Sequence, residues 1–243
     1  LDVRGRASLK RRLSDLGLQV AALCGDFGGH GFAQADQNPK RLEDSKRVMD
    51  LALDLDCRVV TTHIGVVPAD RLHPRYAVLA RACEQLARFG QAAGGTFAIE
   101  TGPEPAEVLR AFLDDLGAPA GLGVNFDPAN LVMVINEDVV TAVKALGPYI
   151  VHTHAKDGRN LKPVDPEKLY AVFAGDKIPG FGWTDYISEE PLGRGKVPWP
   201  QYIQALRQER FDGYLTVERE AGSDRRADVA RAVEFLRDLL AQS

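Results

Sequence analysis

Four short stretches of the chain alternate between bulky apolar residues and small or polar ones, and each ends in an acid or a histidine. They are residues 96–100, 122–127, 150–154 and 214–218. Side chains along a β-strand point to opposite faces in turn. The terminal side chains therefore share a face with small or polar neighbours, and the other face carries Phe97, Ile99, Leu122, Val124, Phe126, Leu215 and Val217. In the stretch 150–154 the same alternation predicts Ile150, His152 and His154 on one face.

The rest of the chain alternates predicted strands with predicted helices. Two more strands are expected over residues 18–24 and 58–63. Helical spacing, with capping residues and glycine or proline at the ends, predicts helices over 6–16, 38–56, 74–94, 103–116, 137–146, 199–208 and 226–240. This order indicates an α/β fold with a parallel sheet. The remaining segment, about 157–198, is rich in glycine, proline and aromatic residues, and we expect it to form a lid because such long connections are usually functional.

Length and composition narrow the class of protein. The 243 residues fit one domain, 1–243, and a net charge of −4 without a basic cluster gives no reason to expect a nucleic-acid partner or a membrane surface. The apolar runs are too short to span a bilayer. Three unclustered cysteines, Cys24, Cys57 and Cys83, are expected to be free thiols in a reducing cytoplasm.

The terminal residues of the four stretches are Glu100, Asp127, His154 and Glu218. A pair of hydrogen-bonded core histidines would explain the stretch 150–154 by itself. Three carboxylates and an imidazole converging at the ends of parallel strands would repel one another or lose hydration unless a cation held them. We therefore expect one divalent ion. A ligand set of one nitrogen and three carboxylates favours Mn²⁺, Mg²⁺ or Co²⁺, with Zn²⁺ as a further option.

The glycine-rich loop over residues 25–31 is a second candidate feature. It lacks the Lys-Ser/Thr pair of a P-loop and the dinucleotide-binding spacing, so neither phosphate site is expected. Two interpretations stay open. It is either a mobile loop that offers Phe27, His30 or Phe32 to a substrate or a plain surface loop.

Five segments, in this order, resemble the xylose-isomerase-like TIM barrels, the sugar-phosphate isomerase/epimerase superfamily. They are residues 98–101, 125–130, 152–157, 191–195 and 215–218. The resemblance implies a (β/α)8-type barrel in which the six predicted strands are the third to the eighth. Two strand–helix units would then be absent, and we expect this chain to be an N-terminally incomplete portion of a longer protein.

The resemblance to the ketose 3-epimerases in this superfamily also implies roles. Glu100, Asp127, His154 and Glu218 would hold the metal. Glu100 and Glu218 would act as acid and base on a ketose or related hydroxyketone through a cis-enediolate. The residues expected to bind substrate are His63, His152, Asn130, Lys156 and Arg194, with His152 alternatively supporting a ligand and Lys156 alternatively in a structural salt bridge with Asp157.

Two positions depart from the ketose 3-epimerase pattern, and both concern the substrate. Asn130 stands where those enzymes have histidine, and Asn160 stands where they have arginine. The substrate is therefore expected to be a small sugar or sugar phosphate of unspecified identity. A homodimer or homotetramer fits such a barrel.

Three functions other than a sugar isomerase or epimerase are alternatives. A dehydratase similar to inosose dehydratase would use the same metal and base but lose water. A sugar-binding barrel without catalysis would show no proton exchange. A DNA-repair hydrolase similar to endonuclease IV needs more metal-binding histidines than this chain offers, and the acidic balance also argues against it.

Overall fold

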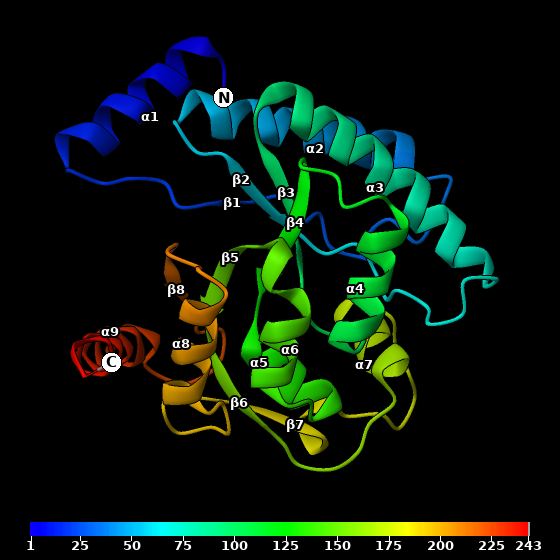
Figure 1. The fold of residues 1–243 in the computed structure, drawn as a ribbon, viewed down its shortest axis with the longest axis vertical. Helices are drawn as coiled ribbons and strands as arrows, with labels where there is room; N and C mark the ends of the chain where they lie inside the picture. Colours follow the sequence, from blue (N-terminus) through cyan, green and yellow to red (C-terminus); the bar gives the residue numbers. More distant parts are fainter. Residues whose placement is uncertain (243) are drawn as a thin grey trace.

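The computed structural model describes residues 1–242, and its centre is a six-stranded parallel sheet (Figure 1). The strands pair in sequence order, as the alternating pattern predicted. They are β1 (Leu23–Cys24), β2 (Val59–Thr62), β3 (Thr96–Glu100), β4 (Leu122–Phe126), β5 (Ile150–Ala155) and β8 (Leu215–Val217). The predicted α/β fold with a curled, TIM-barrel-like parallel sheet is confirmed.

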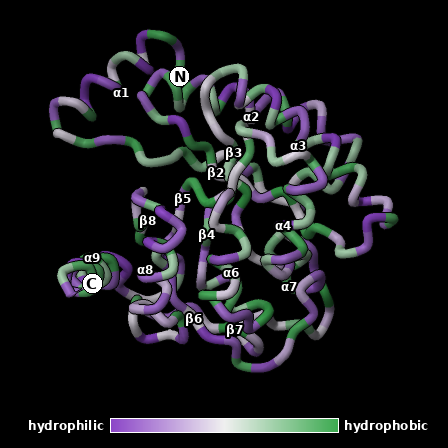
Figure 2. The backbone as a smooth tube through the Cα atoms, in the orientation of Figure 1, coloured by the Kyte–Doolittle hydropathy of each residue, from purple (hydrophilic) through white to green (hydrophobic). Residues whose placement is uncertain are grey.

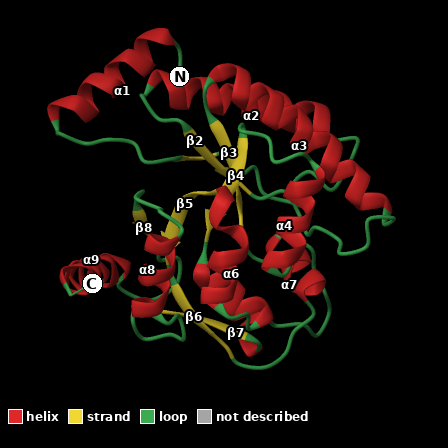
Figure 3. Cartoon of the chain, viewed as in Figure 1, coloured by secondary structure: helices red, strands yellow, loops and turns green. Residues whose placement is uncertain are grey.

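Helices alternate with the strands, and most of them lie on the outer side of the sheet (Figure 3). They are α1 (Val3–Asp15), α2 (Asn38–Asp54), α3 (Pro74–Ala93), α4 (Ala106–Asp115), α5 (Pro128–Asn130), α6 (Val139–Leu146), α7 (Pro166–Phe173), α8 (Trp199–Gln208) and α9 (Arg225–Ala241). Capping residues explain where some of these helices begin and end. The Asp138 side chain accepts a hydrogen bond from Thr141 N at the start of α6, and Gly94 ends α3 with a φ of 78°. None of the helices among residues 1–242 is long and apolar enough to cross a membrane.

The outward faces of the strands form the core with these helices. Phe97, Ile99 and Val124 are at most 1% exposed, and Val217 packs against the same cluster. Hydrophobic positions concentrate on the central strands in Figure 2. The predicted register of β3, β4 and β8 is therefore confirmed, and it turns the polar strand ends to the inner face.

In β5 the prediction for Ile150 was wrong. The register with β4 shifts between Val124 and Asn125, so Ile150 pairs with Val124 and His152 pairs with Asn125. The extra residue is Val151, which lies near the inner-face position of Gly123, whereas Ile150 packs against the core. A β-bulge of this kind reverses the alternation, and the pattern of residues does not reveal it.

The sheet ends at β1 and β8, both on the same side of Figure 1. Strand pairing begins only at Leu23, although the sequence predicts a strand from residue 18. A hydrogen bond from Tyr214 Oη to Gln19 Oε1 (2.8 Å) joins the segments that lead into the two edges.

The segment 157–198 has secondary structure of its own. Strands β6 (Asp157–Asn160) and β7 (Ile187–Glu190) form an antiparallel pair, and α7 and a short 3-10 helix at Trp183–Asp185 lie between them. The Asp157 carboxylate is buried at the base of this segment and accepts five hydrogen bonds. Its donors are Gly158 N, Gly193 N, Gly195 N, Val197 N and Trp199 Nε1.

Candidate active site

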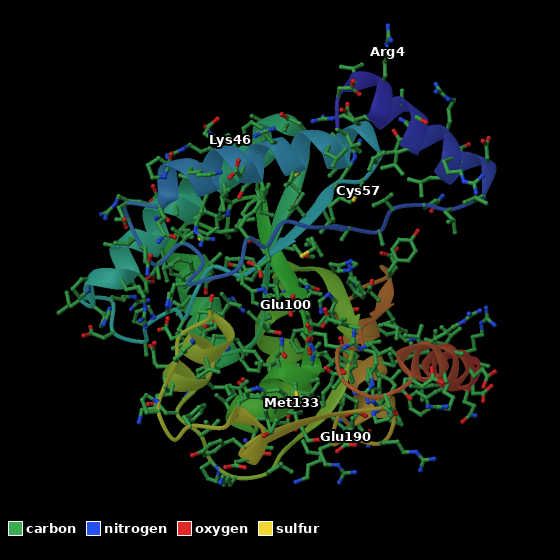
Figure 4. All side chains as sticks on the ribbon, turned by 180° about the vertical axis from the view of Figure 1, so that it is seen from behind. Arg4, Lys46, Cys57, Glu100, Met133 and Glu190 are labelled. Carbon is green, nitrogen blue, oxygen red and sulfur yellow. The ribbon has the colours of Figure 1, made fainter. Side chains whose placement is uncertain are left out.

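The carboxyl ends of β3, β4, β5 and β8 bring four side chains together. Glu100, Asp127, His154 and Glu218 each offer one ligand atom, and these atoms all lie within 4.8 Å of one another. His154 Nδ1 is 3.7 Å from Glu100 Oε1, 3.3 Å from Asp127 Oδ2 and 3.2 Å from Glu218 Oε2. Figure 4 shows Glu100 near the middle of the molecule, at this end of the sheet.

Asp127 is fully buried, and hydrogen bonds hold both its side chain and its backbone N–H. Its Oδ1 accepts hydrogen bonds from Ala129 N (2.8 Å) and Asn130 N (3.0 Å), which caps α5. Its own N–H donates to Thr101 Oγ1. These bonds orient the carboxylate so that Oδ2 faces His154.

Glu100 is held by two amides from the neighbouring strand and helix. Asn125 Nδ2 donates to Glu100 Oε2 (3.0 Å), and Asn130 Nδ2 donates to Glu100 Oε1 (3.1 Å). Asn130, which we expected to bind substrate, also lines the cavity described below. Its amide therefore combines a contact to the carboxylate with access to a ligand.

Charges in the cluster are strongly coupled. Burial alone would lower the pKa of His154, but its contacts with Asp127 and Glu218 raise that pKa far above the usual range. Burial would raise the pKa of Glu218, and the neighbouring His154 and Lys156 lower it instead. Lys156 donates to Glu218 Oε2 (2.9 Å) and to Glu220 Oε2 (2.6 Å). The negative charge of these carboxylates therefore stabilises the positive forms of His154 and Lys156, and it would likewise favour a bound cation.

His63 links Glu100 to an acid that the strand pattern did not identify. His63 Nε2 is 3.5 Å from Glu100 Oε1, and His63 Nδ1 is 3.5 Å from Asp26 Oδ2. Burial would lower the pKa of His63, but the two carboxylates raise it well above its ordinary value. An imidazole placed between two acids can carry a proton from one to the other.

His152 lies behind the cluster. It is 3% exposed, and its Nε2 is 3.0 Å from Thr216 Oγ1. Burial, with His154 as a second cause, lowers the pKa of His152 to about 4. The neutral ring packs edge-on against His154, with 6.0 Å between centroids, so it can support that ligand.

A cavity of about 520 Å³ opens over the cluster. Five residues expected in the site contribute to its wall, namely His63, Glu100, Asn130, Lys156 and Glu218. The loop 25–31 adds Asp26, Gly28 and Gly29. Segment 157–198 adds Pro166, Leu169, Tyr170, Phe173, Ala174, Trp183, Ile187 and Glu189. This segment therefore covers the cavity as a lid would.

Other expectations from the sequence have mixed outcomes. Arg194 is exposed, and its carbonyl accepts a hydrogen bond from Arg159. Lys156 pairs with Glu218 and Glu220 rather than with Asp157, so the alternative of a Lys156–Asp157 salt bridge was wrong. In the glycine-rich loop, Phe32 is buried in the core. His30 contacts Asp176 of the lid segment, with 3.2 Å between Nε2 and Oδ1.

Glu104 lies in the loop after β3 and is 5% exposed. Its Oε2 accepts a hydrogen bond from Val67 N, and burial raises its pKa from 4.5 to about 8. The folded state therefore holds this proton more tightly than the unfolded state does. Stability from this group is complete below about pH 4.5 and decreases as the pH rises toward 8, by roughly 1.4 kcal/mol per unit.

We expect Glu104→Gln to remove this pH dependence, because glutamine keeps an acceptor for Val67 N without a proton to lose. Urea unfolding of both proteins between pH 4.5 and 8 tests it. The variant should gain stability relative to the unaltered chain as the pH rises. A difference that stays constant over this range would contradict the assignment.

Comparisons with known proteins agree with this architecture. The family model described as xylose isomerase-like TIM barrel matches residues 1–239. A search of curated proteins found no match. The solved structure of a xylose isomerase domain protein from Planctomyces limnophilus is 26% identical, with a TM-score of 0.79 over 96% of this chain and 81% of that one.

Two further structures share the fold. The 3-keto-D-glucoside 4-epimerase from E. coli is 12% identical, with a TM-score of 0.71 over 97% of this chain and 85% of that one. A xylose isomerase-like TIM barrel protein from Mycobacterium smegmatis, in complex with magnesium, is 18% identical, with a TM-score of 0.71 over 100% of this chain and 79% of that one.

Proposed function

The chain belongs to the xylose isomerase-like TIM barrel family, and we propose that it is a divalent-metal-dependent sugar isomerase or epimerase. The observation that carries the proposal is the cluster of Glu100, Asp127, His154 and Glu218, of which Glu100 and Glu218 line the cavity. The epimerase among the structural neighbours supports the reaction class.

The residues present fit a metal ion. Three carboxylates and one imidazole place their atoms within 4.8 Å of one another, and the bonds to Asp127 and Glu100 orient the carboxylates before any ion binds. The oxygen-rich set favours Mn²⁺, Mg²⁺ or Co²⁺, and the magnesium complex of the M. smegmatis protein agrees with a hard ion. Such an ion would act as a Lewis acid toward a carbonyl and its neighbouring hydroxyl.

Proton transfer is assigned to two glutamates. One carboxylate removes the proton from the carbon beside the carbonyl, which leaves the enediolate of the substrate, and the other returns a proton to carbon. Glu100 and Glu218 come from strands on opposite sides of β4 and β5 in the sheet order, and both line the cavity. His63 lies between Glu100 and Asp26 and would provide a path for the proton that Glu100 receives.

The state of the cysteines fits our proposal that this is an enzyme of the reducing cytoplasm. Cys24, Cys57 and Cys83 are all free.

Small-molecule sugars are the proposed substrates, since the cavity volume lies in the range of about 300–1,000 Å³ typical of small-ligand sites.

Incubation with ketoses in D₂O tests this function. Full-length protein with Mn²⁺ should exchange the α-proton of at least one ketose with solvent and give a product of otherwise unchanged mass. Loss of 18 mass units would indicate the dehydratase instead. Binding of a sugar without any exchange would indicate the non-catalytic alternative.

A further inference from the structure

One wall of the cavity is apolar, and the reaction proposed at Glu100 and Glu218 does not account for these apolar side chains. The lid contributes Pro166, Leu169, Phe173 and Trp183, and the π-helical turn after α5 contributes Met133 and Val134. The rings of Phe173 and Trp183 lie 5.4 Å apart at an angle of 47°. Phe173 is 59% exposed, although it lines this cavity. Pockets for small ligands are lined mainly by hydrophobic and aromatic side chains, with a few polar groups among them.

The basic groups of the same cavity are already engaged. Among residues 1–242, Lys156 is the only lysine or arginine on this wall, and two carboxylates already bind its ammonium group. The carboxylate of Glu189, on the same wall, is bound by Arg219 (2.7 Å). A phosphate or carboxylate on the substrate would therefore find no free lysine or arginine to offset the loss of its hydration.

The apolar wall and the charged groups of the cavity together indicate one kind of ligand. The acidic part of the cavity suits hydroxyl groups of an uncharged sugar, and the aromatic wall suits a flat apolar group attached to that sugar. Rings prefer offset or edge-on contacts with other rings, and the tilted pair of Phe173 and Trp183 offers both a face and an edge. The wall shares this cavity with Glu100 and Glu218 of the four-residue cluster.

We propose that the substrate is a neutral glycoside whose sugar carries a ketone, and that its planar, apolar aglycone binds against Phe173 and Trp183. Simple glucosides, which have no ketone, serve below as probes of binding only. This inference rests on the proposed function for the identity of the sugar-binding end. It assigns a second, separate role to the lid, which is selection of the aglycone.

Binding of two probes that differ only in the aglycone tests the assignment. Calorimetry of the full-length protein with Mn²⁺ should show phenyl β-D-glucoside binding roughly three- to tenfold more tightly than methyl β-D-glucoside, the range that one aromatic contact gives. Phe173→Ala should remove most of this preference and leave the affinity for the methyl glucoside within about twofold. Because Phe173 is exposed, this variant should fold normally.

Phe181→Ala is the matched control. Phe181 is also a lid phenylalanine, but it stacks on Tyr186, with 4.9 Å between centroids, and does not line the cavity. This variant should keep the preference for the phenyl glucoside. Equal affinities for the two glucosides, undetectable binding of the phenyl glucoside, or an unchanged preference in Phe173→Ala would each overturn the proposal.

A third probe tests the charge argument. Phenyl β-D-glucoside 6-phosphate should bind more weakly than the neutral compound, and equal or tighter binding of the phosphate would overturn the inference. The proposed function can fail separately. Absence of proton exchange with every ketose, together with a persistent phenyl preference, would reject isomerase chemistry and retain the aglycone site. Exchange without a phenyl preference would do the reverse.

Discussion

Glutamine in place of Glu218 should lower turnover by roughly 10²–10⁴-fold, the contribution of a positioned acid or base. Glu218→Gln keeps an oxygen that can bind a metal but removes the carboxylate that accepts a proton. Glu100→Gln should have an effect of the same size, since the proposed mechanism needs one glutamate to remove the proton and the other to return it. Steady-state rates with saturating Mn²⁺ and the best ketose would measure both.

Two other variants separate proton transfer from metal binding. Glu220→Gln removes a carboxylate that also binds Lys156 but lies outside the four-residue cluster, so its cost should be less than about tenfold. Asp127→Asn should act mainly through metal affinity, and excess Mn²⁺ should partly restore its activity. If both glutamine variants exchanged the substrate proton normally with metal saturating, the two-glutamate mechanism would be wrong.

Asp157→Asn should reduce the free energy of unfolding by roughly 2–6 kcal/mol. Asp157 is 1% exposed, and each of its oxygens accepts at least two hydrogen bonds. An asparagine amide has only one accepting oxygen, so at least two of the five donors would face an NH₂ group whichever way it turns. Each buried donor left without a partner costs about 1–3 kcal/mol.

Urea unfolding followed by circular dichroism would measure this loss. Asp212→Asn provides the control, because Asp212 is exposed in the turn before β8 and the same change of charge should have little effect there. A loss below about 1 kcal/mol for Asp157→Asn would contradict the account of this carboxylate.

The four strand-end residues could be identified from the sequence because strand geometry is strictly periodic. Once Phe97 and Val124 face the core, Glu100 and Asp127 must face the other way. The same regularity failed at Ile150, where a bulge inserts one residue and only the pairing with β4 reveals it. The longer helices outside the segment 157–198 were also recovered, since capping residues and hydrophobic spacing act locally.

The remaining parts of the cavity wall depend on contacts between distant segments. Asp26 follows a two-residue strand, and only the fold brings it to His63. Tyr170 and Glu189 belong to a lid whose helix and hairpin the sequence presented as a long connection. The Asp-Phe-Gly-Gly stretch was visible as a loop, but nothing local indicated which of its residues would reach the cavity.

A crystal structure of the full-length protein grown with Mn²⁺, with diffraction measured at the manganese absorption edge, tests the central claim most directly. One anomalous peak should lie about 2.0–2.3 Å from atoms of Glu100, Asp127, His154 and Glu218. The short separation of His154 Nδ1 and Glu218 Oε2, 3.2 Å, already places both within reach of one ion. No peak among these four side chains, at a Mn²⁺ concentration that saturates turnover, would contradict the account.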